Sequence, residues 1–597
     1  MIYSENSYYL NKISLNKNYW KIPTKTEFEN HLELFLSQKF NFPSALIPIL
    51  VKNRISKDNF ENFINSKIKN FLPDPNIFVD MDRTVKRLAD EIENNNPIGI
   101  FGDYDVDGAT SAALLKLFFQ YFGIPVHIHI PDRFLEGYGP NISALKSLVS
   151  KGANLIITVD CGINSNNPLK ELNKTNIDCI IIDHHTPSEE LPPAYSIINP
   201  KRKENKIDYH YLSAVGVTFI MIVGLTRELR HRGVFNKIKE PNLLEFLDLV
   251  ALGTVCDVVP LIGLNRAFVK TGLNVMAQRR NYGINALCDV SDLNKIPDEE
   301  TLGFKLGPKI NAGGRIGSSD MGVKLLISEN INKANEIAIK LHKLNEKRKD
   351  LTNISFMQAI GMVESEKNKI GKIPEILFLA SNEWHEGIIG ILAGKIKEKY
   401  DRPCCVISIG NKISKGSARS LGNISIGSLF LEAVEQEILL KGGGHNLAAG
   451  LTIENNKIET FKEFLFSKVK PFFLKNNPVS EIHITSEVNI SNLNNNLMDW
   501  IIKLGPWGQG NPTPKFIIRD VKIKKLIFFG KDKDHLLLNV SDNSGEIDCK
   551  IFNLNQSPFL QQLRKNENKV LHLLCNVVFN NWKNKKKIEL NLIDIIT

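Results

Sequence analysis

Between about residues 80 and 260, short apolar runs alternate with segments of helical composition. The runs PIGIF, VHIHIP, NLIITVD and DCIIID begin at residues 97, 126, 154 and 178. Each run has the length of one buried strand. Strands of this kind separated by helices predict a parallel sheet with both faces covered, because parallel neighbours are joined by crossover helices. The pattern therefore restricts this region to an α/β fold.

Acidic and histidine residues stand where these apolar runs end. The candidates are Asp103, Asp105, Asp107, Asp160, Asp183, His184, His185 and, after a further apolar segment, Asp257. We expect them to converge, because the carboxyl ends of parallel strands meet at one edge of the sheet. One aspartate after a strand is usually a helix cap or a turn residue, but the repetition on successive strands favours a common site.

A cluster of so many carboxylates needs positive charge between its members, because the anions would otherwise repel one another. Carboxylate oxygens combined with imidazole suit Mn²⁺ or Mg²⁺ better than a structural zinc ion. Two such ions can hold the attacking and leaving oxygens of a phosphoryl displacement. The residues therefore predict a centre of two divalent ions that acts on phosphate esters.

Patterning divides the chain of 597 residues into five parts. Few glycines and prolines and many charges predict the connecting helix, and strand-like alternation predicts the last part. In chain order we expect a mostly helical N-terminal part at 1–75, a parallel-sheet catalytic domain at 76–327, a long connecting helix at 328–366, a second α/β domain at 367–456 and an all-β domain resembling an OB-fold at 475–597. A linker is expected at 470–478.

The charge of the chain favours acidic partners. Lysine and arginine exceed aspartate and glutamate by ten over the whole chain, and residues 475–597 carry 17 basic and 12 acidic residues. The eight cysteines form no CxxC pair, which predicts reduced thiols. No apolar run approaches the roughly 20 residues of a membrane helix, and the start lacks the apolar core of a signal peptide. We expect a cytoplasmic protein that makes no membrane contact.

Four motifs in succession, GDYDVDG, VDCG, DHH and GTVCDVVPL, resemble those of the DHH phosphoesterase superfamily. Three further motifs, NAGGRIG, KGGGHNLAAG and PWGQGNPTPKF, resemble its RecJ branch, the second as part of a DHHA1 domain. The match spans roughly residues 75–597. The resemblance implies hydrolysis of single-stranded DNA from the 5′ end to nucleoside 5′-monophosphates, in repair and recombination. It implies metal ligands at Asp103, Asp105, Asp107, Asp160, His184 and Asp257, and catalytic roles for Asp105, Asp107 and His185.

A second set of residues is predicted to bind phosphate or DNA. Its members are Arg133, Arg315, Ser417, Arg419, His445, Trp582 and Lys583. The residues alone leave alternatives open, because Arg133 could pair with Glu136 and Arg315 could be a solvated residue of a tight turn. His445 could be a buried structural residue, and the basic segment around Trp582 could be the solvated face of a hairpin. The resemblance favours contact with phosphate for the arginines and the serine, and an aromatic among lysines suits a single strand.

Two other functions remain open at this stage. The chain could be a DHH phosphodiesterase of oligoribonucleotides or cyclic dinucleotides, or a scaffold that binds DNA without cleaving it. The basic C-terminal segment argues against the first, and the complete ligand set argues against the second. The resemblance implies a monomer, with a single-strand-binding protein and a RecQ-type helicase as partners.

Overall fold

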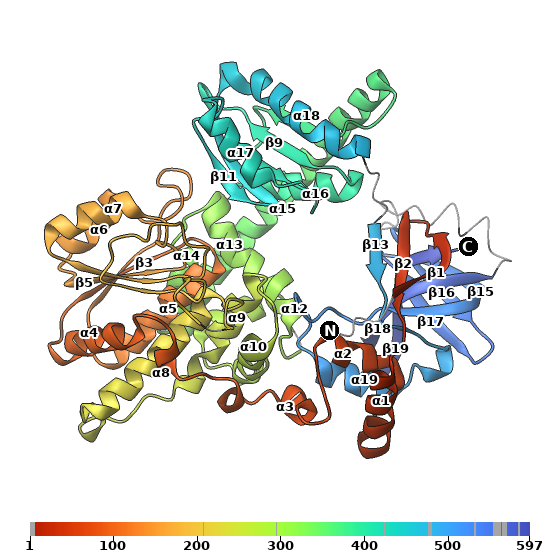
Figure 1. Cartoon of the computed structure of the whole chain (residues 1–597), viewed down its shortest axis with the longest axis horizontal. Helices are drawn as coiled ribbons and strands as arrows, with labels where there is room; N and C mark the ends of the chain where they lie inside the picture. The colour runs from red at the N-terminus through yellow and green to blue at the C-terminus, as the bar shows by residue number, and fades with distance from the viewer. Residues whose placement is uncertain are drawn as a thin grey trace.

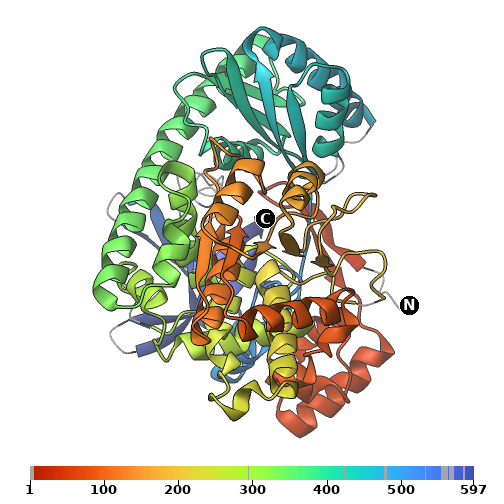
Figure 2. The same ribbon diagram turned by 90° about the vertical axis from the view of Figure 1, so that its left-hand side faces the viewer.

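The computed structural model describes residues 6–206, 208–293, 295–422, 424–475, 480–530, 533–552, 563, 570–582 and 585–597. It contains two α/β domains and a β-barrel domain (Figure 1). The long helix α15 (Ile331–Ile370) runs from the first α/β domain to the second as one continuous helix (Figure 2). The arrangement confirms the predicted fold class, including the connecting helix.

The first α/β domain is built on a five-stranded sheet in the order β4-β3-β5-β6-β7, and every pair in it is parallel. The strands are β3 (Ile98–Gly102), β4 (Val126–His129), β5 (Leu155–Val159), β6 (Asp178–Ile182) and β7 (Ser196–Ile198). The chain goes from β3 to β4 on one side and then returns to place β5 on the other side. The carboxyl ends of β3 and β5 therefore flank the point where the strand order reverses, which is where open α/β sheets bind ligands.

Helices cover both faces of this sheet, as the continuous apolar strands require. On one face Ile100, Ile157 and Ile180 pack against α4 (Met81–Glu93), α5 (Val106–Tyr121) and α8 (Ala214–His231). On the other face Phe101, Ile156 and Ile181 pack against α6 (Ile142–Ser150) and α7 (Asn166–Leu172). Further helices complete the domain: α9 (Leu247–Cys256), α10 (Gly263–Met276), α11 (Tyr282–Asp289), α12 (Glu299–Thr301), the π-helical turn η7 (Leu302–Leu306), α13 (Gly307–Ile316) and α14 (Met321–Leu326).

The second α/β domain contains a mixed sheet in the order β11-β12-β10-β9-β8. Its strands are β8 (Leu377–Ser381), β9 (Cys404–Ser408), β10 (Ile413–Arg419), β11 (Lys441–His445) and β12 (Ala448–Glu454). Helices α15 and α16 (Ile389–Tyr400) cover one face, and α17 (Ile426–Glu435) and α18 (Ile458–Lys475) cover the other. Helix α18 buries Phe461, Leu465 and Val469 in this core. The prediction of a linker from residue 470 is therefore wrong up to Lys475, and residues 476–479 are outside the described part.

The barrel domain is a six-stranded sheet in the order β14-β15-β16-β17-β19-β18, closed by the pairing of β15 with β18. Its elements are β14 (Ser486–Glu487), α19 (Asn495–Leu504), β15 (Phe516–Phe529), β16 (His535–Ser541), β17 (Glu546–Ile551), β18 (Leu571–Trp582) and β19 (Lys585–Ile596). All eight cysteines of the chain are free thiols, as the sequence predicts. Among the described residues, no helix combines the length and the apolar character needed to cross a membrane.

The N-terminal segment packs on the barrel domain. It begins with two strands that the sequence did not indicate, β1 (Asn6–Ile13) and β2 (Asn18–Pro23), and β2 pairs in parallel with β13 (Ser480–His483). Helices α1 (Glu27–Phe40), α2 (Ile47–Lys52) and α3 (Phe60–Asn65) follow and share one apolar core with the barrel. The prediction of a mostly helical N-terminal part thus missed the local hairpin β1–β2, and it also missed β13, which pairs with β2 across more than 450 residues.

Candidate active site

The acidic and histidine residues lie together at the carboxyl edge of the first sheet. Asp103 follows β3, Asp160 follows β5 and the Asp183-His184-His185 segment follows β6. The strands end in register, with Gly102 opposite Val159 and Val159 opposite Ile182. Asp160 has a φ of +61°, a backbone conformation that L-residues rarely adopt. Backbone strain of this kind occurs preferentially at functional sites.

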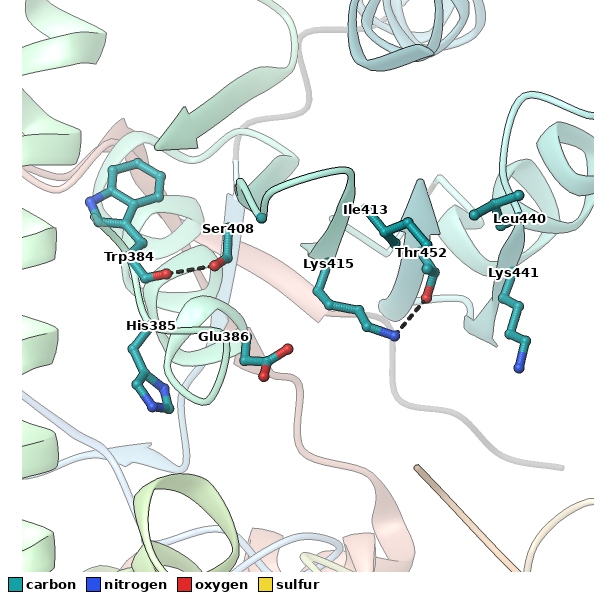
Figure 3. A pocket seen from close by; sticks show the side chains of 10 residues that line it. Trp384, His385, Glu386, Ser408, Ile413, Lys415, Leu440, Lys441 and Thr452 are labelled. Carbon is teal, nitrogen blue, oxygen red and sulfur yellow. Dashed lines mark hydrogen bonds between the residues drawn. The ribbon is translucent and has the colours of Figure 1, made fainter. Parts of the chain in front are cut away.

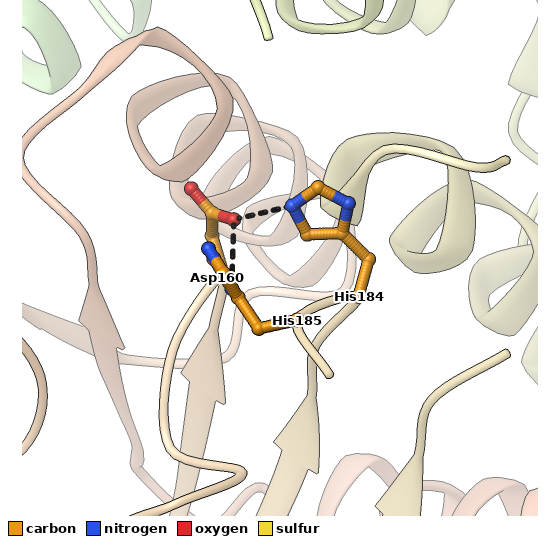
Figure 4. A group of neighbouring side chains, drawn as sticks. All are labelled: Asp160, His184 and His185. Atoms are coloured by element: carbon orange, nitrogen blue, oxygen red, sulfur yellow. Dashed lines mark ion pairs between the residues drawn. The ribbon is translucent and has the colours of Figure 1, made fainter. Parts of the chain in front are cut away.

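Three overlapping groups of side chains are close enough to hold metal ions. They are Asp103-Asp105-Asp160, Asp107-His184-Asp257 and Asp160-His184-His185, and the ligand atoms within each group lie within 4.8 Å of one another. His184 is central, since its Nε2 lies 3.3 Å from Asp160 Oδ1 (Figure 4) and 3.5 Å from Asp257 Oδ2. The structure thus brings together all six residues that the sequence proposes as ligands, and places His185 beside them.

Several of these atoms are buried without a hydrogen-bond partner. They are Asp103 Oδ1, Asp160 Oδ1, His184 Nε2 and Asp257 Oδ2. An unpartnered buried polar atom costs about 1–3 kcal/mol, and more when the group is charged. Four such atoms from four segments of chain are difficult to explain as structural residues. Divalent cations with oxygen and imidazole ligands would satisfy all of them, so the donor set fits Mn²⁺ or Mg²⁺.

The remaining atoms of the ligands are fixed by the scaffold. His184 Nδ1 donates to the Leu212 carbonyl oxygen at 3.1 Å, so that Nε2 carries the lone pair that faces the cluster. Asp107 accepts the backbone N–H groups of Ala214 and Val215 at 2.7 and 2.9 Å, at the start of α8. Asp105 caps α5 by accepting from Gly108 N at 3.0 Å. The scaffold therefore orients these three candidate ligands.

The pKa values of the clustered carboxylates are raised, because burial and mutual repulsion oppose their negative charge. Burial, together with repulsion from Asp105, raises the pKa of Asp107 to about 7. Burial, with repulsion from Asp107 and Asp105, raises the pKa of Asp257 to about 9. The pKa of Asp160 is raised for the same reasons, and burial lowers the pKa of His184 to about 3. A neutral imidazole can ligate a metal ion, and a divalent ion relieves the repulsion between closely packed carboxylates. Binding of such an ion to this cluster is therefore favourable.

Asp183 does not join the three groups but holds His185. Asp183 Oδ1 accepts from His185 Nδ1 at 2.8 Å and from two backbone N–H groups, while Oδ2 accepts from Ile163 N. Burial acts to raise the pKa of Asp183, but the hydrogen bond and charge of His185 outweigh it and lower the pKa to about 2. Burial likewise opposes charge on His185, whose pKa is nevertheless raised by Asp183. Asp183 thus holds the His185 imidazole beside the cluster, and the raised pKa favours the protonated form.

Basic residues line a cavity of about 620 Å³ between the two α/β domains. Arg133, Tyr138 and Arg315 come from the first domain, and Ser417 and Arg419 come from β10 in the second. Burial, together with repulsion from Arg133 and other arginines, lowers the pKa of Arg315 to about 10, and the pKa of Arg419 is lowered in the same way. Crowded, partly desolvated guanidinium groups suit a bound phosphate.

The structure decides between the alternatives for the two arginines of the first domain. Arg133 lies over the Tyr104 ring, with its guanidinium carbon 5.0 Å from the centroid, and Glu136 instead accepts from His129 and Asn141. The tight turn considered for Arg315 is wrong, because the NAGGRIG segment is part of helix α13. A Cβ on Gly314 would lie 3.2 Å from the Tyr104 carbonyl oxygen, so this glycine lets α13 approach the acidic loop.

A second cavity of about 750 Å³ continues from the first within the second α/β domain (Figure 3). Both cavities are lined by Glu386, Lys415, Lys441 and Thr452. Lys415 donates to Thr452 Oγ1 at 3.1 Å. The basic surface therefore extends beyond the arginines that the sequence identified.

The structure places one of the three other predicted DNA contacts. His445 ends β11 and is exposed, so a buried structural role is excluded, and neither cavity includes it among its lining residues. Trp582 ends β18, but its side chain is outside the described part of the structure, and so is Lys583. Their roles remain predictions.

Sequence reasoning missed two residues of the site. Tyr138 Oη lies 3.2 Å from His185 Nδ1 and also lines the phosphate cavity, so it connects the two parts of the site. Arg348 on α15 has a buried, unpartnered Nε, and its charge lowers the pKa of Arg315. Tyr138 stands five residues after Arg133 in the same loop, which was a usable signal. Arg348 lies in a charged helical segment that gives no such signal.

Comparison with known proteins agrees with this geometry. Family models match the DHH family N-terminal domain at residues 97–254, the DHHA1 domain at 374–470 and the RecJ OB domain at 484–594. The single-stranded-DNA-specific exonuclease RecJ of Haemophilus influenzae is 33% identical over 81% of this chain and 85% of its own length. The chain belongs to the RecJ family.

Other RecJ proteins are similar at the same level. RecJ of Bacillus subtilis is 31% identical over 94% of this chain and 69% of its own length. RecJ of Escherichia coli is 34% identical over 80% of this chain and 84% of its own length. The crystal structure of Thermus thermophilus RecJ with Mn²⁺ superposes with a TM-score of 0.79 over 97% of this chain and 79% of that one. That protein is 23% identical, so the superposition shows a common fold.

Proposed function

We propose that this RecJ-family protein is a metal-dependent exonuclease of single-stranded DNA that works from the 5′ end and releases nucleoside 5′-monophosphates in DNA repair and recombination. The curated RecJ relatives are named single-stranded-DNA-specific exonucleases. The observation that carries the proposal is the convergence of four unpartnered buried ligand atoms at the edge of the first sheet. These atoms favour an enzyme that hydrolyses phosphodiesters over a scaffold protein that binds DNA without cleaving it.

Two Mn²⁺ or Mg²⁺ ions would be held by Asp103, Asp105, Asp107, Asp160, His184 and Asp257. When bound, such ions lower the pKa of water and neutralise the charge that develops on a phosphate. The protein's own contribution is to fix each ligand, through Leu212 for His184 and through the start of α8 for Asp107. His185, held by Asp183 with a raised pKa, would donate a hydrogen bond to an oxygen of the scissile phosphate.

The basic cavity supports digestion that begins at the 5′ end of the strand. Arg133, Arg315 and Arg419 line a space between the two α/β domains. Tyr138 lines the same space, and its Oη lies 3.2 Å from His185 Nδ1. A terminal 5′ phosphate in this cavity would place the next phosphodiester of the strand toward the metal cluster. Ser417 Oγ accepts from Arg419 Nη1 at 3.1 Å, which presents the guanidinium to the cavity.

The barrel domain is proposed to hold the strand on the other side of the cluster. Residues 484–594 match the RecJ OB domain model, and OB-folds bind single strands by aromatic stacking and basic grooves. Trp582 and Lys583 are the proposed contacts there, and His445 is a proposed contact of the second α/β domain. The substrate also supports a cytoplasmic location and two partners, since single-strand-binding protein covers such strands and a RecQ-type helicase produces them. We propose that the protein acts as a monomer, which light scattering of the purified chain tests.

The first experiment is digestion of 3′-labelled, 5′-phosphorylated single-stranded DNA with Mn²⁺, beside duplex and circular DNA. Release of mononucleotides from the linear single strand alone supports the proposal, provided that Asp105→Ala abolishes it. Asp178→Asn is the matched control, because Asp178 begins β6 at the opposite edge of the same sheet. Mn²⁺ binding without cleavage of any DNA would overturn the proposed substrate, and absence of both would overturn the proposed enzyme.

A further inference from the structure

Two lysines line the second cavity without a carboxylate to neutralise them. Lys415 on β10 and Lys441 on β11 lie on either side of Thr452, because the register pairs each of them with this residue of β12. Figure 3 shows Thr452 between the two side chains. Lys415 donates to the neutral Thr452 hydroxyl, and neither lysine forms an ion pair with a residue in the described part of the chain. The two ammonium groups therefore remain available to an anionic ligand.

The arginines of the phosphate cavity are in the same state. The hydrogen bonds that Arg315 and Arg419 donate all go to neutral oxygens, and the Arg133 guanidinium lies over an aromatic ring. Glu386 is the one carboxylate among the residues that line the two cavities, against three arginines and two lysines. A terminal monophosphate carries about two negative charges. The two cavities together therefore carry more positive charge than a 5′ monophosphate neutralises.

The second cavity lies beyond the arginines as seen from the metal cluster. Arg419, Ser417 and Lys415 alternate along one face of β10, so each step between them is about 6.6 Å. Arg419 and Ser417 line only the phosphate cavity, as does Tyr138, which contacts His185, whereas Lys415 lines both cavities. A strand with its 5′ phosphate at the arginines and its next phosphodiester at the cluster does not reach the second cavity. An extension of the 5′ end itself does.

The surface between the two cavities is bare backbone. Gly450 on β12 lies opposite Ser417 and lines the phosphate cavity. A Cβ at this position would have the Gly416 carbonyl oxygen as its nearest neighbour, 3.9 Å away. Any side chain on residue 450 would therefore project into open space, and glycine keeps the way from the arginines to the lysines clear.

We propose that the second cavity binds the β and γ phosphates of a strand that carries a 5′ triphosphate, while the arginines bind its α phosphate. The inference rests on the proposed function, because it requires the 5′ end of the strand to occupy the phosphate cavity. Lys415 and Lys441 supply point charges for the two outer phosphates, and the Thr452 hydroxyl can donate to an oxygen between them. The substrate class thus includes strands with 5′ polyphosphate ends.

Binding in this register determines the products. The oxygen of a water molecule bonds to the phosphorus of the first phosphodiester, the bond from that phosphorus to the 3′ oxygen breaks, and the 3′ oxygen takes a proton from the water. The first product is therefore a nucleoside 5′-triphosphate, and the shortened strand begins with a 5′ monophosphate. Every later turnover releases a nucleoside 5′-monophosphate.

The test compares three single strands of one sequence that end in a 5′ triphosphate, a 5′ monophosphate or a 5′ hydroxyl, each with Mn²⁺. In the wild type, KM for the triphosphate strand should be lower than KM for the monophosphate strand by about tenfold or more, because two further charged contacts form. With a radioactive γ phosphate, the first labelled product should be a nucleoside triphosphate. An equal or higher KM for the triphosphate strand overturns the proposal. So does initial release of inorganic phosphate or pyrophosphate, which would place the polyphosphate at the metal cluster.

Variants of the two lysines assign the effect to the second cavity. Lys415→Ala and Lys441→Ala should each raise KM for the triphosphate strand by about five- to twentyfold, and KM for the monophosphate strand by less than about threefold. Lys412→Ala is the matched control, since Lys412 is an exposed lysine just before β10 that lines neither cavity. We expect the control to match the wild type with all three strands. Equal effects of a lysine variant on the triphosphate and monophosphate strands overturn the proposal.

Failure of the proposed function is recognised separately. If the wild type digests none of the three strands, binding of a 3′-fluorescent triphosphate strand to the metal-free protein still compares the wild type with Lys415→Ala. Weaker binding of the triphosphate strand by the variant, with equal binding of the monophosphate strand, would support the polyphosphate site without the nuclease. Equal binding of both strands by the two proteins would overturn it.

Discussion

The metal cluster and the phosphate cavity are assembled in different ways, although Tyr138 joins them. The cluster takes its side chains from the strand ends and helix ends of one domain, between Asp103 and Asp257. The cavity places Arg133 and Arg315 opposite Ser417 and Arg419, which belong to another domain. In a single parallel sheet the register of the strands brings the residues at their ends together, whereas residues of two domains meet only if the domains pack in the right way. The positions of residues after apolar runs in the sequence can therefore predict the first kind of site but not the second.

The two regions also carry opposite and uncompensated charges. Burial raises the carboxylate pKa values of the cluster and lowers the guanidinium pKa values of the cavity. Each region therefore favours a ligand of the opposite charge, a divalent cation in one and a phosphate in the other. Divalent cations in the cluster and a phosphate of a nucleic-acid strand in the cavity would compensate both charges at once. The four predictions that follow test this division.

The largest effect is expected from a ligand of the cluster. Asp160→Asn should lower the rate of mononucleotide release by about 10³-fold or more, because Asp160 Oδ1 belongs to two of the three ligand groups and its charge is needed in the reaction. The rate is measured with Mn²⁺ and a 5′-phosphorylated single strand, and melting temperature verifies the fold. Retention of activity within about tenfold would contradict the assignment of this carboxylate.

A smaller and more selective effect is expected in the cavity. Arg419→Ala should raise KM for a 5′-phosphorylated strand by about 10- to 100-fold, the value of a charge-assisted hydrogen bond, with a smaller change for a 5′-hydroxyl strand. Arg419→Lys should restore part of the loss, since it keeps the charge but not the planar fork. Equal effects on both kinds of strand would show that Arg419 does not contact the terminal phosphate.

The cluster should also link stability to pH. Without metal, the raised pKa values of Asp107 (about 7) and Asp257 (about 9) stabilise the fold fully only below the unfolded value of about 4. That contribution is lost as pH rises through 7 and 9. Mn²⁺ displaces these protons, so its apparent affinity should rise by up to about tenfold per pH unit for each proton displaced.

Thermal shift with and without Mn²⁺ measures this linkage, and the increase in melting temperature should be larger at pH 8 than at pH 6. Asp257→Asn should flatten the difference. A shift that is independent of pH would contradict the raised pKa values.

The smallest effect on catalysis is expected where the N-terminal segment meets the barrel. Asp594 is fully buried and accepts from Ser14, Asn16, Asn18 and Trp20. Asp594→Asn should lower the free energy of unfolding by about 1–3 kcal/mol, because an amide cannot accept all these hydrogen bonds. Urea denaturation measures the loss, with Asp520→Asn on the exposed surface of β15 as control. A matching loss of Mn²⁺ affinity would show that the two regions are coupled.

Much of the first domain could be predicted from the sequence. Four apolar runs gave β3, β4, β5 and β6, and the strand β7 was missed because SII is too short to stand out. All six proposed ligands converge. Parallel register aligns Asp103, Asp160 and His184 at the strand ends, whereas Asp105 and Asp107 lie at the start of α5 and Asp257 lies at the end of α9. Asp183 was grouped with the cluster by spacing, but its strand end directs it to His185 instead.

Other parts could not be predicted from the chain alone. The helix around Arg315 was open to interpretation as a turn because its glycines are close-packing positions, and their neighbour, Tyr104, is about 200 residues away. The strand β2 has one local partner, β1, but its other partner, β13, lies more than 450 residues away in the chain. Arg348 looks like a solvated charge until α15 is placed against α13.

The sequence by itself determined the fold class, the edge of the sheet where the acidic and histidine residues gather, and which of them are candidate ligands. It could do so because short apolar runs and the residues that follow them are local properties of the chain. The tertiary structure alone decided which arginines face each other across the cavity and where the N-terminal hairpin pairs. Those outcomes depend on which surfaces remain after distant segments have packed, and no local pattern contains that information.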